Sequence, residues 1–162
     1  IAIRAAIASD VLCVVLLVNA DKEFVKQVIA EVKPDLLQFH GDESADFCQQ
    51  FDFPYIRALR MRDDLNIAAE AKAHKPAHSL LFDAWHPGQY GGTGESFDWA
   101  RLPRERSFNL ILAGGLTPDN VAESVAVVAP DMVDVSGGVE SAPGIKDPQK
   151  VRDFIQRAKA AG

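Results

Sequence analysis

The sequence predicts an α/β fold of the (β/α)8 barrel type. The chain has 162 residues, and short apolar runs alternate along it with segments whose apolar residues repeat at helical spacing. Predicted strand ends recur about every 20 to 30 residues, which is typical of successive βα units. Polar residues follow several of these strands, as expected when one ring of loops builds one site. These residues are Asn19, His40, Asp83 and Ser136.

A doubly wound sheet is the other common arrangement of βα units. It would gather its ligand groups at one switch point, often with a G-x-G-x-x-G fingerprint, which is absent here. A closed barrel needs about eight strands and six are predicted, so two further units of about 40 residues would complete it. The chain also begins at Ile1 without an initiator Met and in mid-helix. We therefore expect residues 1–162 to be a single barrel domain that is incomplete at its N-terminus.

The first half of the chain is predicted to begin with the end of a helix at 1–8, followed by a strand at 11–18. That run is continuously apolar and β-branched, which is typical of a strand covered on both faces. A helix capped by Asn19 or Asp21 comes next, with an apolar face and an end at Lys33-Pro34. The residues of that face are Phe24, Val25, Val28, Ile29 and Val32. Further strands are predicted at 35–39, 55–59 and 79–82, and helices at 44–50 and 64–74.

The second half begins with a long loop, HPGQYGGTGESFDW, that follows Asp83. Its glycines, Gly92 among them, would let it fold over a ligand, or it is a flexible surface loop. Strands at 110–113 and 132–135 follow, with a helix between them, and a last helix spans 148–159.

Two glycine pairs predict a phosphate site. Gly114-Gly115 and Gly137-Gly138 each end a predicted strand, and Ser136 precedes the second pair. Glycine lets backbone N–H groups approach an anion, and a helix that begins just beyond adds the positive end of its dipole. One pair alone would indicate only a tight turn. Two pairs one βα unit apart favour phosphate binding, as in the last two loops of many (β/α)8 barrels.

Three further polar groups are candidates for chemistry. Asp83 ends an apolar strand, where partial desolvation suits a carboxyl group to general-acid work, or it caps the loop that follows. Gln38 and His40 share one face of a strand and either bind a ligand or satisfy backbone groups. Asp134 lies inside the last strand, where an acid is costly unless it hydrogen-bonds to a ligand or a neighbouring donor.

Other charged residues are predicted to lie at the surface. We expect Arg57 and Arg60 to form surface ion pairs rather than to bind a carboxylate, and His74 and His78 to be solvent-exposed. The spacing of His, Cys and Asp implies no metal site.

The composition excludes several classes of protein. The net charge of −6 and the scattered Lys and Arg argue against nucleic-acid binding. No apolar run is long enough to cross a membrane. Cys13 and Cys48 are distant in the sequence, which predicts buried thiols in a reducing cytoplasm rather than a disulfide framework.

Several motifs in order closely resemble the phosphoribosylanthranilate isomerase family. They are LLQFHGDES, the strand ending in Asp83 with GQYGGTGESFDW, LILAGGLTPDNV and VDVSGGVESAPGIKD. The resemblance extends from VVLLVNA to the last helix. It implies a (β/α)8 barrel of tryptophan biosynthesis that converts N-(5-phosphoribosyl)anthranilate into 1-(2-carboxyphenylamino)-1-deoxyribulose 5-phosphate. That Amadori rearrangement needs neither a metal nor an organic cofactor.

The resemblance also implies roles for individual residues. Asp83 matches the general acid that protonates the ribose ring oxygen, after which a general base removes the C2 proton of the Schiff base. Gln38 and His40 would line the sugar pocket, and Asp134 would help to fix the substrate. The phosphate would be held by Gly114, Gly115, Gly137 and Gly138, with Gly92 and Ser136 as further binding candidates.

Two features of the family are missing from residues 1–162. The family's general base is a cysteine in a K-I-C-G-I-T-like segment, and an arginine grips the anthranilate carboxylate. Cys13 in mid-strand and Cys48 on a helix cannot replace that cysteine. We therefore expect the base in an absent N-terminal segment, and this chain by itself to catalyse poorly or not at all. The full-length protein is expected to be a monomer, whereas the apolar edges at 11–18 and 132–135 would allow an edge-paired or swapped dimer of the fragment.

Two alternatives to the isomerase are open. Another phosphosugar barrel, such as indole-glycerol-phosphate synthase or a ribulose-phosphate epimerase, would need catalytic lysines or metal-binding histidines at its strand ends, and neither pattern is present. The chain would otherwise be a non-catalytic, phosphate-binding barrel fragment.

Overall fold

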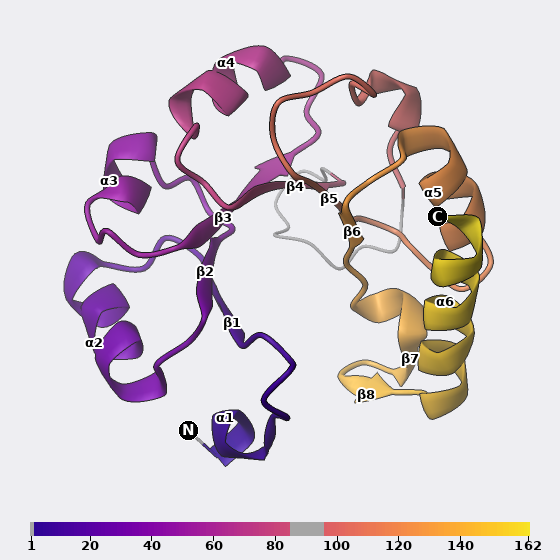
Figure 1. Ribbon diagram of the computed structural model, residues 1–162, viewed down its shortest axis with the longest axis horizontal. Coiled ribbons are helices and arrows are strands. Elements are labelled where there is room, and N and C mark those ends of the chain that lie inside the picture. Colours follow the sequence, from indigo (N-terminus) through magenta and orange to yellow (C-terminus); the bar gives the residue numbers. More distant parts are fainter. Residues whose placement is uncertain (1, 85–95) are drawn as a thin grey trace. The chain divides into compact units, whose positions relative to one another are not determined.

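Strands and helices alternate along the chain, as the computed structural model shows for residues 2–84 and 96–162 (Figure 1). The main strands are β1 (Val14–Leu17), β2 (Leu36–Phe39), β3 (Tyr55–Arg60), β4 (Ser79–Asp83), β5 (Leu110–Leu112) and β6 (Met132–Val133). They form one sheet in the order of the sequence. The predicted succession of βα units is thereby confirmed.

Six α-helices and two short 3₁₀ helices accompany these strands in the described residues. The α-helices are α1 (Ala2–Ala6), α2 (Lys22–Val32), α3 (Ala45–Gln49), α4 (Ile67–Ala73), α5 (Val121–Val128) and α6 (Pro148–Ala161). The 3₁₀ helices are η1 (Trp99–Arg101) and η2 (Gly137–Val139), and a separate hairpin pairs β7 (Glu140–Ala142) with β8 (Ile145–Lys146). The chain divides into a first unit, 1–58 with 66–80, and a second unit, 59–65 with 81–162.

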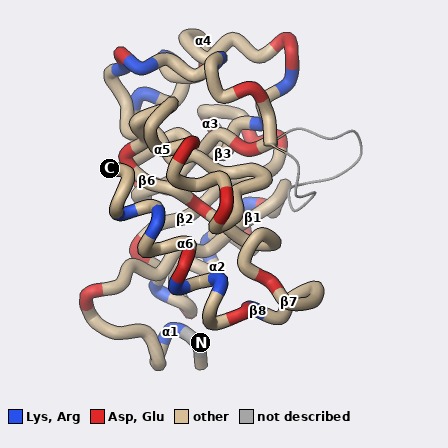
Figure 2. The backbone as a smooth tube through the Cα atoms, turned by 90° about the vertical axis from the view of Figure 1, so that its right-hand side faces the viewer, with Lys and Arg blue, Asp and Glu red and all other residues tan. Residues whose placement is uncertain are grey.

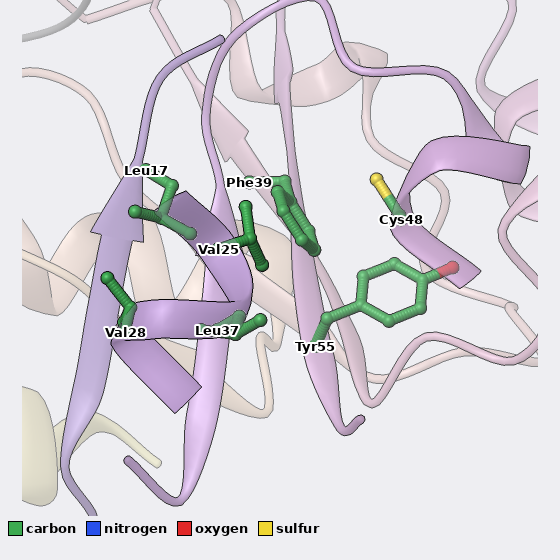
Figure 3. Close-up of a cluster of buried hydrophobic side chains, with 7 residues drawn as sticks. All are labelled: Leu17, Val25, Val28, Leu37, Phe39, Cys48 and Tyr55. Carbon is green, nitrogen blue, oxygen red and sulfur yellow. The ribbon is translucent and has the colours of Figure 1, made fainter. Parts of the chain in front are cut away.

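The first unit is built on three parallel strands. Val14 of β1 pairs with Leu36 of β2, and Leu37 pairs with Tyr55 of β3. Side chains from these strands, α2 and α3 form one hydrophobic cluster (Figure 3). Its buried members are Leu17, Val25, Val28, Leu37, Phe39, Cys48 and Tyr55. The carboxyl ends of β1 and β2, at Leu17 and Phe39, therefore pack in this core.

Helix α2 shows how this core forms. The Asp21 side chain caps it by accepting from the Phe24 N–H at 2.8 Å, so Asp21 and not Asn19 is the cap. Val25 and Val28 are buried, and Ile29 and Val32 pack against the cluster. Phe24, by contrast, is 51% exposed. It lies at the edge of the apolar face, about 40° around the helix from Val28 and about 100° from Val25.

Strand β1 is shorter and less covered than predicted. Leu17 is buried, but Val14 and Leu16 are 39% and 55% exposed. Successive side chains of a strand point to opposite faces, and in the described residues only the Leu17 face packs against the cluster. The prediction of a strand covered on both faces is therefore wrong for this chain.

The second unit pairs β5 with β6 in parallel, Ile111 opposite Met132, and Ala113 N–H donates to the β4 carbonyl of Phe82 at 2.9 Å. Helix α5 packs against α6. Phe82, Leu110, Leu112, Leu116, Val121, Val128 and Phe154 are buried here. The hairpin of β7 and β8 was not predicted, although Pro143-Gly144 between its strands is a turn signal and Gly144 has a φ of 77°.

Charges of both signs are interspersed along the tube in Figure 2. Within the described residues, each helix is too short or too polar to cross a membrane.

Candidate active site

Asp83 ends β4 in the second unit, as predicted. Its residue is 6% exposed, and its Oδ1 accepts from the N–H of Ala84 at 2.9 Å. Its backbone carbonyl accepts from Met61 N–H at 2.9 Å, which holds the strand end in place. The capping contact and a chemical role are compatible, because a carboxylate oxygen can accept more than one hydrogen bond. The predicted loop glycines that follow, Gly92 included, lie outside the described residues.

The first glycine turn lies directly against Asp83. Gly114 and Gly115 have φ angles of 80° and 65°, a left-handed conformation that favours glycine. A Cβ on Gly114 would lie 2.9 Å from Asp83 Oδ1 and would overlap Ala84 N. The Asn120 side chain holds this turn, since Oδ1 accepts from Thr117 N–H at 2.8 Å and Nδ2 donates to the Gly115 carbonyl at 2.9 Å.

The second glycine turn contacts the first. A Cβ on Gly138 would overlap the carbonyl oxygen of Leu116 and lie 3.2 Å from Thr117 Cα. The two backbones therefore approach each other so closely that a side chain does not fit between them. Gly137 is different, because a Cβ there would meet nothing within 4 Å. Of the second pair, only Gly138 is required by packing.

An α-helix was predicted to begin just beyond the glycine turns. Helix α5 begins at Val121, several residues after the first turn, and the second turn enters the short η2 rather than an α-helix. In the described residues neither turn leads directly into an α-helix, so that part of the prediction is wrong.

A lysine beside the second turn was missed. Lys146 Nζ donates to the Ser136 carbonyl at 3.0 Å, to Ser136 Oγ at 3.3 Å and to Glu140 Oε1 at 2.7 Å. The Lys146 bond, followed by an N–H bond from Gly144, lowers the pKa of Glu140. The unpredicted hairpin thus brings a cation to the turn.

Asp134 lies beyond β6 rather than inside a strand. Its N–H continues the ladder by donating to the Leu112 carbonyl at 2.8 Å, but the residue is exposed. The prediction that this acid is desolvated inside a strand is therefore wrong, because β6 ends at Val133 and Asp134 is exposed.

Gln38 and His40 come together at the end of β2 in the first unit. Both are buried, and His40 Nδ1 lies 3.0 Å from Gln38 Oε1. Because the amide oxygen only accepts, Nδ1 carries a proton in this contact. Helix α3 begins soon after these two residues and is capped by Ser44, whose side chain accepts from Phe47 N–H at 3.2 Å.

A buried ion pair stands beside His40. Arg57 NH1 donates to Glu43 Oε2 at 2.9 Å, and the side chains are 10% and 3% exposed. The predicted surface ion pair of Arg57 is therefore wrong. Glu43 was missed, although it belongs to the LLQFHGDES motif, because a lone acid after a strand carries no signal of its burial.

His74 is also buried, contrary to the prediction that it is exposed. Its ring contacts the Tyr55 hydroxyl at 3.3 Å. Burial, followed by the charge of Arg57, lowers the pKa of His74 to about 4. His78 is exposed as predicted.

The prediction that both cysteines are buried thiols is confirmed. Both are buried and free, and burial raises the pKa of Cys48 to about 12. Cys13 precedes β1 rather than lying in mid-strand, and its N–H donates to Asp35 Oδ2 at 2.7 Å. Among residues 2–84 and 96–162, no group of three His, Cys, Asp or Glu side chains could hold a metal ion.

Comparison with known proteins identifies the family. Residues 3–157 match the family model of N-(5'-phosphoribosyl)anthranilate (PRA) isomerase. The isomerase of Cellvibrio japonicus is 51% identical over 146 residues, which are 90% of this chain and 68% of that protein. The crystal structure of the Thermotoga maritima isomerase aligns with a TM-score of 0.87 and 32% identity over 98% of this chain and 78% of that one. A phosphoribosylanthranilate isomerase in complex with reduced 1-(o-carboxyphenylamino)-1-deoxyribulose 5-phosphate aligns with a TM-score of 0.83, 29% identity and coverage of 98% and 77%. The chain therefore belongs to the N-(5'-phosphoribosyl)anthranilate isomerase family of tryptophan biosynthesis.

Proposed function

We propose that Asp83 is the general acid of the Amadori rearrangement of N-(5'-phosphoribosyl)anthranilate. It would protonate the ribose ring oxygen as the C1–O bond breaks, which opens the ring to a Schiff base. Loss of the C2 proton to a general base then gives an enolamine, which tautomerises to the ketone product. The observation that carries the proposal is the buried carboxylate at the end of β4, in contact with the Gly114 turn.

The two glycine turns are the proposed phosphate site. Backbone N–H groups of Gly114, Gly115, Gly137 and Gly138 would bind the phosphate oxygens. The close contact of Gly138 with Leu116 supports this, because it brings both turns to one place. Ser136 would add its hydroxyl, and Lys146 would place a positive charge beside it. A phosphate contact from Gly92 stays a prediction from the sequence.

The sugar is the proposed ligand of Gln38 and His40. Their mutual hydrogen bond at the end of β2 supports this role, since it orients the ring of His40. Asp134, exposed after β6, would help to fix the substrate.

The proposed general base is neither Cys13 nor Cys48. A thiol must ionise to act as a base, and burial of Cys48 opposes this. We further propose that residues 1–162 belong to one (β/α)8 barrel domain, in keeping with the sheet order and the TM-score of 0.87. On this proposal residues 1–162 alone bind phosphate weakly and catalyse the rearrangement poorly or not at all. A cytoplasmic location and a monomeric full-length state are proposed with it.

The test follows the loss of anthranilate fluorescence as the enzyme of natural length consumes its substrate. Asp83→Asn keeps the shape and the Ala84 contact but removes the acid, so kcat should fall by about 10²- to 10⁴-fold. The affinity for inorganic phosphate should not change. A variant with more than a tenth of the original kcat would show that Asp83 is not the acid. The intact mass of the assayed protein shows which length was measured.

A further inference from the structure

We propose that the buried pair of Glu43 and Arg57 positions His40 for the substrate. The inference rests on the proposed function, in which His40 contacts the sugar. Neither charged side chain has to touch the substrate for this role, so both are positioning residues.

The Glu43 carboxylate ties three strand ends together. Its Oε1 accepts from the Asn19 N–H at 2.7 Å, just beyond β1. Its Oε2 accepts from the Gly41 N–H at 2.9 Å, beyond β2, and from Arg57 NH1 of β3 at 2.9 Å. A buried carboxylate is costly unless such donors satisfy it, and hydrogen bonds to a charged group are stronger than neutral ones. Glu43 therefore fixes the ends of β1 and β2 against β3.

Arg57 holds the backbone on both sides of His40. NH1 donates to the carbonyl of Phe39 at 3.3 Å, and NH2 donates to the carbonyl of Gly41 at 3.2 Å. A guanidinium group is planar and its N–H bonds point in fixed directions. The two carbonyls that flank His40 are therefore held in one orientation relative to each other.

The contacts of Glu43 and Arg57 fix the backbone around His40, and His40 makes two further hydrogen bonds. Its N–H donates to the Leu17 carbonyl at 2.8 Å, and Nδ1 donates to Gln38 Oε1 at 3.0 Å. Gly41 next to it approaches Asn19 so closely that a Cβ would lie 2.7 Å from Asn19 Cγ. The peptide and the ring of His40 are thus both fixed, and the tautomer with it.

Stability alone does not explain the pair. Replacing a buried ion pair by apolar side chains of similar size is often neutral or stabilising, so such a pair is weak support for a stabilising role. In the described residues Arg57 Nε is buried without a hydrogen-bond partner, which is a further cost. The need to hold His40 in one orientation explains why a buried Glu43–Arg57 pair is present although it does not raise the free energy of unfolding.

The test uses the enzyme of natural length and begins with Glu43→Gln. We expect kcat to fall by about 10- to 100-fold, the usual loss when a supporting residue of a site is removed. The variant leaves Arg57 buried without its partner, so its melting temperature should also fall. The double variant Glu43→Gln/Arg57→Met removes both charges and should regain stability but not kcat. Recovery of kcat together with stability would overturn the inference.

The decisive readout is a double-mutant cycle with His40→Asn. If Glu43 acts through His40, Glu43→Gln should lower kcat less than about 2-fold further when His40 is already replaced. If Glu43→Gln lowers kcat equally in the original enzyme and in the His40→Asn variant, Glu43 does not act through His40. If His40→Asn itself leaves kcat and KM unchanged, the proposed role of His40 fails, and the inference fails with it. If His40→Asn lowers kcat but the losses from His40→Asn and Glu43→Gln are additive, the inference about Glu43 is overturned while the proposed role of His40 stands.

Asp35→Asn is the matched control in the same unit. Asp35 also accepts from a backbone N–H next to β1, that of Cys13 at 2.7 Å, and pairs with an arginine, Arg4, at 3.4 Å. These contacts lie at the amino ends of β1 and β2 rather than at their carboxyl ends. The control should lower the melting temperature and leave kcat unchanged. A loss of kcat equal to that of Glu43→Gln would show that destabilisation of this unit is enough, and would contradict positioning.

Discussion

The two units hold their candidate residues by different physical means. In the first unit, charged side chains fix the backbone around His40, with Glu43 and Arg57 at the centre. In the second unit, backbone packs directly on backbone, and Gly114 and Gly138 leave no room for a side chain. The contacts around His40 depend on two side chains, so the stability lost by replacing Glu43 can be regained by also replacing Arg57. A glycine contact depends on the absence of atoms, so a single methyl group breaks it and no second substitution nearby restores it.

The glycine contact therefore offers the most severe test. Gly138→Ala would place Cβ on the Leu116 carbonyl oxygen, so one of the two turns must move. We expect a loss of roughly 3 kcal/mol or more in the free energy of unfolding. The affinity for inorganic phosphate should fall more than about 10-fold, because 1.4 kcal/mol of lost binding energy is enough for that. Chemical denaturation and titration calorimetry measure the two effects.

The neighbouring glycine supplies the control for this variant. A Cβ on Gly137 meets nothing within 4 Å, so Gly137→Ala should change stability by less than about 0.5 kcal/mol. Equal losses for Gly137→Ala and Gly138→Ala would mean that backbone flexibility, and not close packing of the two turns, governs this site.

The difference between the units also decides what could be predicted from the sequence. Glycine pairs after apolar runs are a local signal, and Asp83 also follows an apolar run, so the positions of these candidates at strand ends could be predicted from the sequence, while their roles stay predictions. The charged frame of the first unit was missed. Glu43 and Arg57 are 14 residues apart, and no local pattern distinguishes a buried Arg and Glu from a pair on the surface.

The errors in the fold have the same origin. Apolar runs predicted the existence and order of the strands correctly, because periodicity is local. Burial depends on what packs against each face, which is tertiary information. The exposed Leu16 and Phe24 and the buried His74 were misplaced for that reason.

His74 makes the first unit sensitive to acid. Burial and the charge of Arg57 lower its pKa from 6.5 to about 4, despite Glu70 Oε2 at 3.7 Å from Nε2. The unfolded chain therefore binds a proton below about pH 6.5 that the folded chain excludes until about pH 4. Stability should fall as the pH drops through this window, by up to about 3 kcal/mol at 1.36 kcal/mol per pKa unit. Urea unfolding at pH 7 and pH 4.5 would measure the loss.

The second unit should not share this dependence. Hydrogen bonds, from the Leu110 N–H to Asp131, from the Lys146 side chain to Glu140 and from the Lys150 N–H to Asp147, hold the pKa values of these three acids below their usual range. Stability from a depressed acid is present above the unfolded pKa and is lost only at lower pH. His74→Gln should therefore flatten the loss between pH 6.5 and pH 4.5. If it does not, another group in the chain is responsible for the acid sensitivity.

The smallest effect is expected where a side chain supports a glycine turn. Lys146 donates to Ser136 and Glu140 but is about half exposed, so Lys146→Met should cost less than about 1 kcal/mol of stability. If its charge also assists the proposed phosphate site, KM should rise about 2- to 5-fold at low salt, and the difference should shrink as salt screens the charge. Lys150→Met is matched to it, since Lys150 Nζ donates to the Glu140 carbonyl at 2.7 Å and contacts the same hairpin without contacting the turn. An equal rise in KM for both variants would mean that only net charge matters. A rise confined to Lys146→Met would show that the second unit, too, depends on one charged side chain at its turn.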